Sequence, residues 1–167
     1  RGFASPNLQP LARAGVSIEF ATTVIRDPVA GPIRRTGGVC RAVTGLRLHP
    51  GTDRYDLEAA LGRPGLQGFV LEGYGAGNGP TESWFLDPLR SAVDRGVTVC
   101  ITTQCRAGSV VGGLYASGSA LLATGAVSGG DMTFEAALTK LMVLTDRHGP
   151  DDVRRLMQQD MAGELSV

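Results

Sequence analysis

The sequence predicts a doubly wound α/β fold, in which helices cover both faces of a parallel sheet of about four strands and make a small three-layer domain. Two observations predict it. From residue 43 onward, short apolar stretches alternate with segments of helical periodicity, and this alternation favours a parallel sheet. The chain has 167 residues and is 43% apolar, which is enough to bury the core of one domain.

Four strands are expected, at residues 43–48, 68–72, 97–102 and 126–127. Each is an apolar stretch bounded by glycine, proline or polar residues. Five helices are expected, at residues 53–61, 83–95, 116–124, 133–145 and 151–161. Pro88 lies inside the second helix and favours a start delayed to a cap at Asp87, because proline fits the first turn of a helix better than its interior.

The helix expected at residues 133–145 has the clearest pattern. Its apolar side chains recur at i, i+3, i+4, i+7 and i+8, namely Phe134, Ala137, Leu138, Leu141 and Met142. This spacing places them on one face, which we expect to pack against the sheet. Asp131 or Thr133 can cap the start of this helix.

Residues 1–42 differ from the rest of the chain. Proline and glycine interrupt them repeatedly, and only residues 16–21 alternate as a strand does. We therefore expect residues 1–42 to form an extended linker, and residues 43–167 to form the folded domain.

Charge and cysteine content exclude several classes of function. The 16 basic and 16 acidic side chains balance, which argues against a nucleic-acid partner or an acidic membrane surface. No apolar run approaches the ~20 residues that cross a bilayer. Cys40, Cys100 and Cys105 are an odd number without metal-ligand spacing. We therefore expect reduced thiols in an intracellular compartment, no metal site and no cofactor.

Two loops could bind a ligand. Ligands of an open parallel sheet lie outside the carboxyl ends of its strands, and residues 72–80 and 103–113 follow two such ends. The first loop is rich in glycine and carries Asn78, whose amide can both donate and accept a hydrogen bond. Asn78 either contacts a ligand or only stabilises the turn. The loop lacks a complete phosphate-binding motif.

No catalytic group is apparent in the chain itself. Cys105 follows a strand end, but no histidine is near it in the sequence to act as a base. Lys140 is the only lysine and lies away from the apolar face of its helix, so we expect it to be solvated or salt-bridged. The sequence therefore predicts no catalytic residue.

Several segments occur together in the order of one known family. They are Ser5-Pro6-Asn7, His49-Pro50-Gly51, Val70-Leu71-Glu72-Gly73-Tyr74-Gly75-Ala76-Gly77-Asn78-Gly79-Pro80, Thr103-Gln104-Cys105, Tyr115, Gly118, Gly130-Asp131-Met132-Thr133 and Gly163-Glu164-Leu165. The chain resembles the C-terminal half of a type I, cytoplasmic L-asparaginase of the asparaginase/glutaminase family. The asparaginase-like subunit of archaeal glutamyl-tRNA amidotransferase is a related protein.

The resemblance implies hydrolysis of L-asparagine to L-aspartate and ammonia. The threonines that catalyse it in the family belong to an N-terminal domain and match no position of this chain, so an N-terminal catalytic domain or subunit is an expected partner. A cytoplasmic homodimer or homotetramer is also expected. The alternatives are a non-catalytic subunit or small amino-acid-binding module, and a component of a tRNA-dependent amidotransferase.

The resemblance also assigns roles to three residues. It implies that Asn78 reaches the active site of a neighbouring subunit and helps to hold the charged head group of the substrate. Glu72 and Cys105 lie where some bacterial type I enzymes bind asparagine as an activator. Those enzymes tend to have a basic residue at the place of Glu72, so this chain departs from their pattern.

Overall fold

The computed structural model describes residues 6–28, 30–32, 37–110 and 116–166. The chain forms two compact units, residues 1–36 and residues 37–167. Two of the residues named above, Ser5 and Tyr115, lie outside the described residues, as does the end of the second loop. The role of residues 1–42 as a linker stays a prediction.

The first unit contains two short antiparallel strands, β1 (Ala12–Ala14) and β2 (Ile18–Phe20). β2 lies within the strand expected at residues 16–21. β1 was not expected, because three residues are too few to establish an alternating pattern and alanine is depleted in strands. Ile18 and Phe20 are each 64% exposed, so the alternation marks a strand here but not a buried face.

The second unit is built on a parallel sheet. Its strands are β3 (Val43–Arg47), β4 (Gly68–Gly73), β5 (Thr98–Thr103) and β6 (Val127–Ser128). They stand in the order β3-β4-β5-β6. The doubly wound arrangement is wrong, because such a sheet extends from a central strand in both directions. Here each new strand is added beside the last, so the sheet grows in one direction only.

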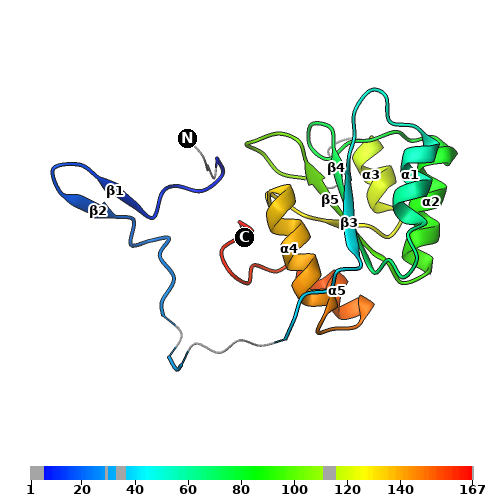
Figure 1. The fold of residues 1–167 in the computed structure, drawn as a ribbon. Coiled ribbons are helices and arrows are strands. Elements are labelled where there is room, and N and C mark those ends of the chain that lie inside the picture. The colour runs from blue at the N-terminus through cyan, green and yellow to red at the C-terminus, as the bar shows by residue number, and fades with distance from the viewer. Residues whose placement is uncertain (1–5, 29, 33–36, 111–115, 167) are drawn as a thin grey trace. The chain divides into compact units, whose positions relative to one another are not determined.

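Helices cover both faces of this sheet, which confirms the three-layer α/β domain. On one side lie α1 (Arg54–Leu61), α2 (Ser83–Asp94) and α3 (Ala116–Leu122), and on the other lie α4 (Phe134–Thr145) and α5 (Pro150–Met157) (Figure 1). Right-handed crossovers that step in one direction place their helices on one face, which explains α1 to α3. The last two helices follow the final strand and fold back over the other face.

Alternation along the strands separates two cores. On β4, Phe69 and Leu71 pack with α1, α2 and α3, whereas Val70 between them packs with α4 and α5. All three side chains are fully buried. A strand buried on both faces is apolar throughout rather than alternating, which is why the apolar runs in the sequence locate β4 and β5.

The ends of two helices differ from those expected. α2 begins at Ser83 and contains Pro88 in its interior, so the delayed start at Asp87 is wrong. An interior proline costs about 3 kcal/mol. The early start, however, brings Phe85 onto the same side of the helix as Leu89, and both are fully buried. α5 ends at Met157 rather than at residue 161.

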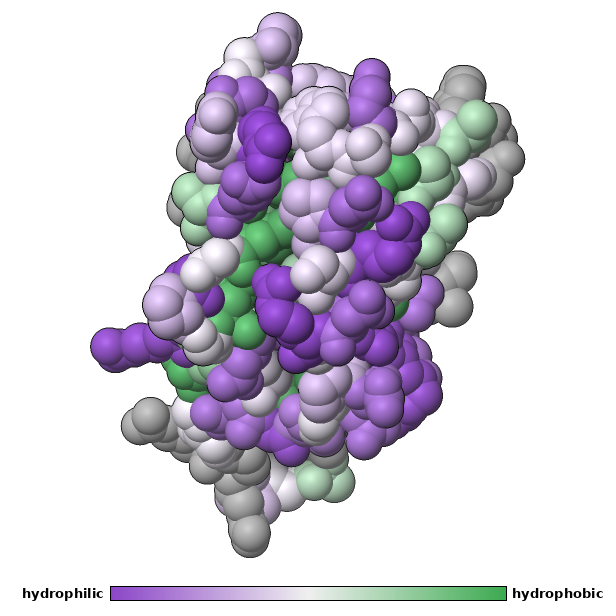
Figure 2. Space-filling view, turned by 90° about the vertical axis from the view of Figure 1, so that its right-hand side faces the viewer, coloured by the Kyte–Doolittle hydropathy of each residue, from purple (hydrophilic) through white to green (hydrophobic). Residues whose placement is uncertain are grey.

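The side of the domain that carries α1 and α2 is mainly polar. Figure 2 views this side, where hydrophilic residues cover most of the surface and apolar residues appear as a narrow band between them. Exposed ion pairs, Arg54–Glu58 on α1 and Arg90–Asp87 on α2, belong to these two helices. Among the described residues, no helix has the length and apolar character needed to cross a membrane.

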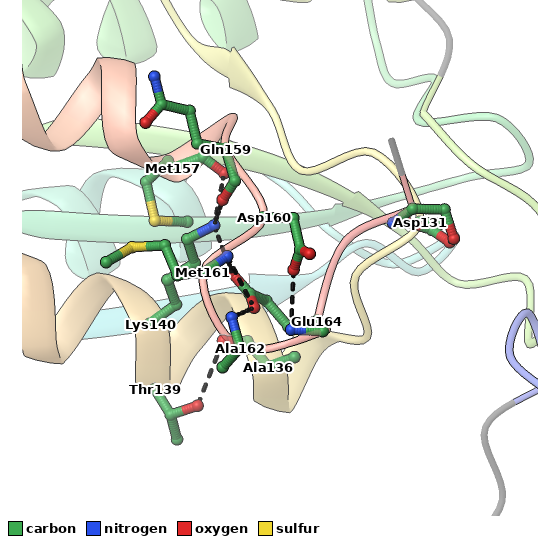
Figure 3. A network of polar contacts seen from close by, with 12 residues as sticks. Asp131, Ala136, Thr139, Lys140, Met157, Gln159, Asp160, Met161, Ala162 and Glu164 are labelled. Carbon is green, nitrogen blue, oxygen red and sulfur yellow. Dashed lines mark hydrogen bonds and ion pairs between the residues drawn. The ribbon is translucent and has the colours of Figure 1, made fainter. Parts of the chain in front are cut away.

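A buried ion pair fixes the C-terminal segment against α4. The ammonium of Lys140 lies 2.6 Å from the Glu164 carboxylate, and their side chains are only 7% and 14% exposed. Lys140 also donates to the carbonyls of Met157, at 3.2 Å, and Gln159 (Figure 3). These bonds engage the carbonyls at the end of α5 and help to end that helix. The expected salt-bridged role of Lys140 is therefore confirmed, and the solvated role is wrong.

Two further contacts hold the same segment. Backbone N–H groups of Met161 and Ala162 donate to the Glu164 carboxylate, at 3.1 and 2.6 Å. The hydroxyl and N–H of Ser166 donate to the two oxygens of Asp131, which precedes α4. The residues after α5 therefore fold back along α4 as a fixed segment.

We predict that Glu164→Leu lowers the free energy of unfolding by about 3 kcal/mol, because it leaves the Lys140 ammonium buried and unpaired. Chemical denaturation at neutral pH measures this. The matched control, Glu58→Leu in the exposed pair with Arg54, should change it by about 0.5 kcal/mol or less. Equal losses in both variants would contradict the role given to the buried pair.

The Lys140–Glu164 pair also makes the free energy of unfolding depend on pH. Burial tends to raise the pKa of Glu164, but hydrogen bonds from Lys140 and from the N–H groups of Ala162 and Met161 prevail and lower it to about 2. Since this pKa lies below its ordinary value of 4.5, the stabilisation is complete above pH 4.5 and is lost as the pH falls towards 2. We predict a stability difference between wild type and Glu164→Leu that shrinks over this interval. A difference independent of pH would contradict it.

Candidate functional site

The glycine-rich loop after β4 is a closed turn. The N–H of Tyr74 donates to the carbonyl of Asn78 at 2.8 Å, and the N–H of Asn78 donates back to the carbonyl of Tyr74 at 2.7 Å. Gly75 and Gly77 have φ values of +48° and +88°, in the left-handed region that favours glycine. A Cβ at Gly77 would also lie 2.7 Å from Val110. The loop therefore requires glycine and holds its backbone in one conformation.

The Asn78 side chain takes no part in closing this turn. Its oxygen Oδ1 accepts a hydrogen bond of 2.9 Å from the hydroxyl of Ser117, at the start of α3. Within the part of the chain that the structure describes, its nitrogen Nδ2 has no hydrogen-bond partner. The side chain is half-buried, and the backbone alone closes the turn. The Asn78 side chain therefore has no role in closing the turn, and its nitrogen is not among the buried atoms that lack a hydrogen-bond partner in the described residues, so it is available to solvent or to a ligand.

The two predicted loops are joined at the carboxyl ends of β4 and β5. The hydroxyl of Thr103 donates to the carbonyl of Gly75, and the N–H of Gln104 donates to the carbonyl of Gly73 at 3.0 Å. The side-chain amide of Gln104 donates to the carbonyls of Glu72, at 3.1 Å, and Leu48, at 2.5 Å. Gln104 belongs to the Thr103-Gln104-Cys105 segment named above, but no role was predicted for it, although an amide directly after a buried strand was the available signal.

Glu72 lies on the α4 side of the sheet. Its carboxylate is 3.2 Å from the Arg47 guanidinium on the neighbouring strand. Burial raises the pKa of Glu72 above its ordinary value, the Arg47 charge opposes the shift, and the nearby Glu135 carboxylate adds to it. Thr102 stands beside Glu72 in register on β5, and its hydroxyl is buried without a hydrogen-bond partner. Neither Arg47 nor Thr102 was predicted, though strand alternation assigns all three to one face.

The cysteines do not form a catalytic pair with histidine. Cys105 is exposed, and its N–H donates to the Thr103 hydroxyl at 3.0 Å. Cys100 is buried, and burial raises its pKa to about 12 against the opposing charge of Lys140, so it is a protonated core residue. In the described ranges, no hydroxyl or thiol is hydrogen-bonded to a histidine ring, and no group of three or more histidine, cysteine or acidic side chains could hold a metal.

The geometry therefore brings Asn78, Ser117, Thr103 and Gln104 together at one edge of the sheet. Glu72 and Cys105 reach the same edge, and Gln104 links the backbone of Glu72 to the Cys105 turn. This arrangement can orient a polar ligand through a fixed amide. It offers no activated nucleophile among the described residues.

Three comparisons with known proteins all lead to asparaginases. The family model of the glutaminase/asparaginase C-terminal domain matches residues 42–157. L-asparaginase 1 of Escherichia coli is 36% identical over 165 residues, which cover 98% of this chain and 48% of that protein. The crystal structure of L-asparaginase I from Vibrio cholerae superposes with a TM-score of 0.86 at 36% identity, covering 100% of this chain and 52% of that one.

Similar proteins also carry other names. The 60 kDa lysophospholipase of Homo sapiens is 40% identical over 168 residues, covering 98% of this chain and 29% of that protein. A glutamyl-tRNA(Gln) amidotransferase subunit of Methanopyrus kandleri is 37% identical over 172 residues, covering 98% of this chain and 36% of that protein. The chain thus spans about half or less of the length of these relatives.

The matched family model covers most of the domain that carries the two joined loops, and the structural match extends over the whole chain. The chain therefore belongs to the glutaminase/asparaginase family and corresponds to its C-terminal part.

Proposed function

We propose that this chain is the C-terminal part of an L-asparaginase, which hydrolyses L-asparagine to L-aspartate and ammonia. The observation that carries the proposal is the Asn78 amide, whose oxygen is fixed by Ser117 at 2.9 Å while its nitrogen is unpaired among described residues. Such a group suits the recognition of a polar substrate. The lack of an activated nucleophile in the described residues fits a reaction whose catalytic threonines lie on an N-terminal domain or subunit.

The assembly is part of this proposal. We propose a cytoplasmic homodimer or homotetramer in which Asn78 reaches the active site of a neighbouring subunit. The exposed Ile18 and Phe20 of the first unit support a further covering partner, because apolar side chains gathered on a surface often mark an interface. The amidotransferase alternative is favoured by the similarity to the Methanopyrus kandleri protein, and it differs in needing tRNA and ATP.

We predict that residues 1–167 alone release no ammonia from asparagine, and that the addition of an asparaginase N-terminal domain, joined or separate, produces activity. Ammonia release is measured without tRNA and without ATP. Turnover by the 167-residue chain alone would contradict the proposal that the catalytic threonines lie on an N-terminal domain or subunit. Activity of the complete enzyme that requires tRNA and ATP would favour the amidotransferase.

We predict that Asn78→Ala in the complete enzyme raises KM for asparagine by about tenfold or more, because a hydrogen bond to a charged group is worth about 1.5–3 kcal/mol. Steady-state kinetics measure it. Gln158→Ala is the matched control, since this exposed amide donates only within the end of α5, and its KM should equal that of wild type. An unchanged KM and kcat in Asn78→Ala would reject the substrate-binding role.

We also propose that Glu72 and Cys105 border an effector pocket. An amino-acid effector has an ammonium group, which the Glu72 carboxylate can bind in competition with Arg47. We predict that asparagine saturation of the complete enzyme is sigmoidal and that Glu72→Gln makes it hyperbolic, because the charge that holds the ammonium is removed. A hyperbolic curve for the wild type, or a sigmoidal one retained by Glu72→Gln, would reject the pocket.

A further inference from the structure

Leu165, in the segment after α5, is held on both sides. Its neighbour Glu164 forms the buried ion pair with Lys140, at 2.6 Å. On its other side, Ser166 donates to the carboxylate of Asp131 through its N–H, at 2.8 Å, and through its hydroxyl. Figure 3 shows Glu164 on the segment that runs on towards Asp131. Leu165 is therefore fixed between two anchored residues, and its half-buried side chain packs against the core under α4 and α5.

The side chain of Leu165 lies on Gly130, in the loop between β6 and α4. A Cβ at Gly130 would collide with Cδ1 of Leu165, and Gly130 has a φ value of +56°, so both the space and the backbone conformation require glycine. β6 is a two-residue strand at the edge of the sheet, paired with β5 alone. Because so short a ladder restrains little of the chain after it, the contact with Leu165 adds support to this loop.

The residues that follow β5 are bonded to the same loop at Val110. The N–H of Val110 donates to the carbonyl of Gly130 at 2.8 Å, and the hydroxyl of Ser128 donates to the carbonyl of Val110 at 2.9 Å. The N–H of Gly130 in turn donates to the hydroxyl oxygen of Ser128 at 3.0 Å. A displacement of Gly130 would therefore either carry Val110 with it or break these hydrogen bonds.

Val110 extends this set of contacts to the turn of Asn78. Its side chain is only 7% exposed, and a Cβ at Gly77 would lie 2.7 Å from Cγ1 and 2.9 Å from Cγ2 of Val110. Both methyl groups thus lie against the backbone of Gly77, which directly precedes Asn78. A row of four contacting residues therefore leads from the C-terminal segment to this turn: Leu165, Gly130, Val110 and Gly77. The row passes round the edge strand β6, from the core under α4 and α5 to the core under α1, α2 and α3.

We propose that Leu165 is a positioning residue, which acts through this row of contacts to hold the turn of Asn78 in the conformation that binds substrate. The inference rests on the proposed function, in which Asn78 contacts the substrate. The turn is also bonded to the loop after β5, so loss of the Leu165 contact loosens the turn without unfolding it. A turn that spends less time in the binding conformation lowers the apparent affinity by the fraction lost.

The test measures KM and kcat for asparagine in the complete enzyme that carries Leu165→Ala. We expect KM to rise about fivefold and kcat to stay within about twofold, as for a loss of uniform binding. Leu165→Met keeps a side chain of similar volume and should restore the wild-type KM. A wild-type KM in Leu165→Ala, or a Leu165→Met variant as impaired as Leu165→Ala, would overturn the inference.

The matched control is Leu156→Ala. Leu156 is also half-buried and packs against the same core as Leu165, but it lies on α5 and outside the row of contacts. Its truncation should lower the free energy of unfolding, as that of Leu165 does, and leave KM unchanged. An equal rise of KM in both alanine variants would show a general loss of packing and would contradict a specific role for Leu165.

Double-mutant cycles test the route from Leu165 to the turn. If Leu165 acts through Val110, the combined variant Leu165→Ala/Val110→Ala should have a KM within about twofold of the worse single variant. If the effect reaches substrate through Asn78, adding Leu165→Ala to Asn78→Ala should likewise change KM by less than about twofold. Penalties that multiply in either pair would contradict the proposed route.

Failure of the inference and failure of the proposed function give different results. If the complete enzyme does not hydrolyse asparagine, hydrogen exchange at the N–H groups of Tyr74 and Asn78, which close the turn, still measures how firmly the turn is held. In the full-length protein, Leu165→Ala should speed this exchange about fivefold, and Leu156→Ala should leave it unchanged. Unchanged exchange in Leu165→Ala would overturn the inference. Faster exchange together with a wild-type KM in Asn78→Ala would reject the substrate-binding role and leave the holding of the turn intact.

Discussion

The pairing of β4 with β5 up to their last residues is the constraint on which the site depends. Gly73 and Thr103 are partners at the end of this ladder, and the N–H of Gln104 adds one more bond, to Gly73. When two neighbouring parallel strands end at paired residues, the loops that follow them begin side by side. The Thr103 hydroxyl then reaches Gly75 in the other loop. A slip of one residue would turn Thr103 to the opposite face of the sheet and separate the loops.

This constraint explains why the glycines of the first loop cannot be replaced easily. The loop leaves a buried strand and turns back within five residues, so its backbone approaches both Val110 and the adjoining β5 loop. A Cβ at Gly73 would lie 2.8 Å from the carbonyl of Asn78. This turn is closed by backbone hydrogen bonds between Tyr74 and Asn78 and needs no side-chain hydrogen bond. It therefore leaves the Asn78 amide for its contact with Ser117.

Much of the fold could be predicted from local pattern, because β4, β5 and α4 are long, strongly patterned segments. The start of α2 could not, since it depends on whether the burial of Phe85 outweighs the cost of Pro88, and that balance is set by the other helices. The sequential strand order was also missed, because short connections alone do not fix direction. In the site, glycine spacing pointed to Asn78. The contacts of Ser117, Arg47 and Gln104 join distant segments, and no local pattern encodes them.

Strand alternation divides the polar groups at this edge between the two faces of the sheet. Glu72 and Arg47 project to the α4 side, whereas the Asn78 amide is bonded to α3 on the other side. A ligand at Glu72 would therefore approach from the α4 side, and the shortest covalent connection from there to the amide is the backbone that leads from Glu72 into the turn of Asn78. That backbone is bonded to Gln104 at two carbonyls, those of Glu72 and Gly73, and to Asn78 through Tyr74. An effector would consequently act by shifting the whole turn, and the side chains of Gln104 and Thr103, which both bond the first loop, would move the two loops together.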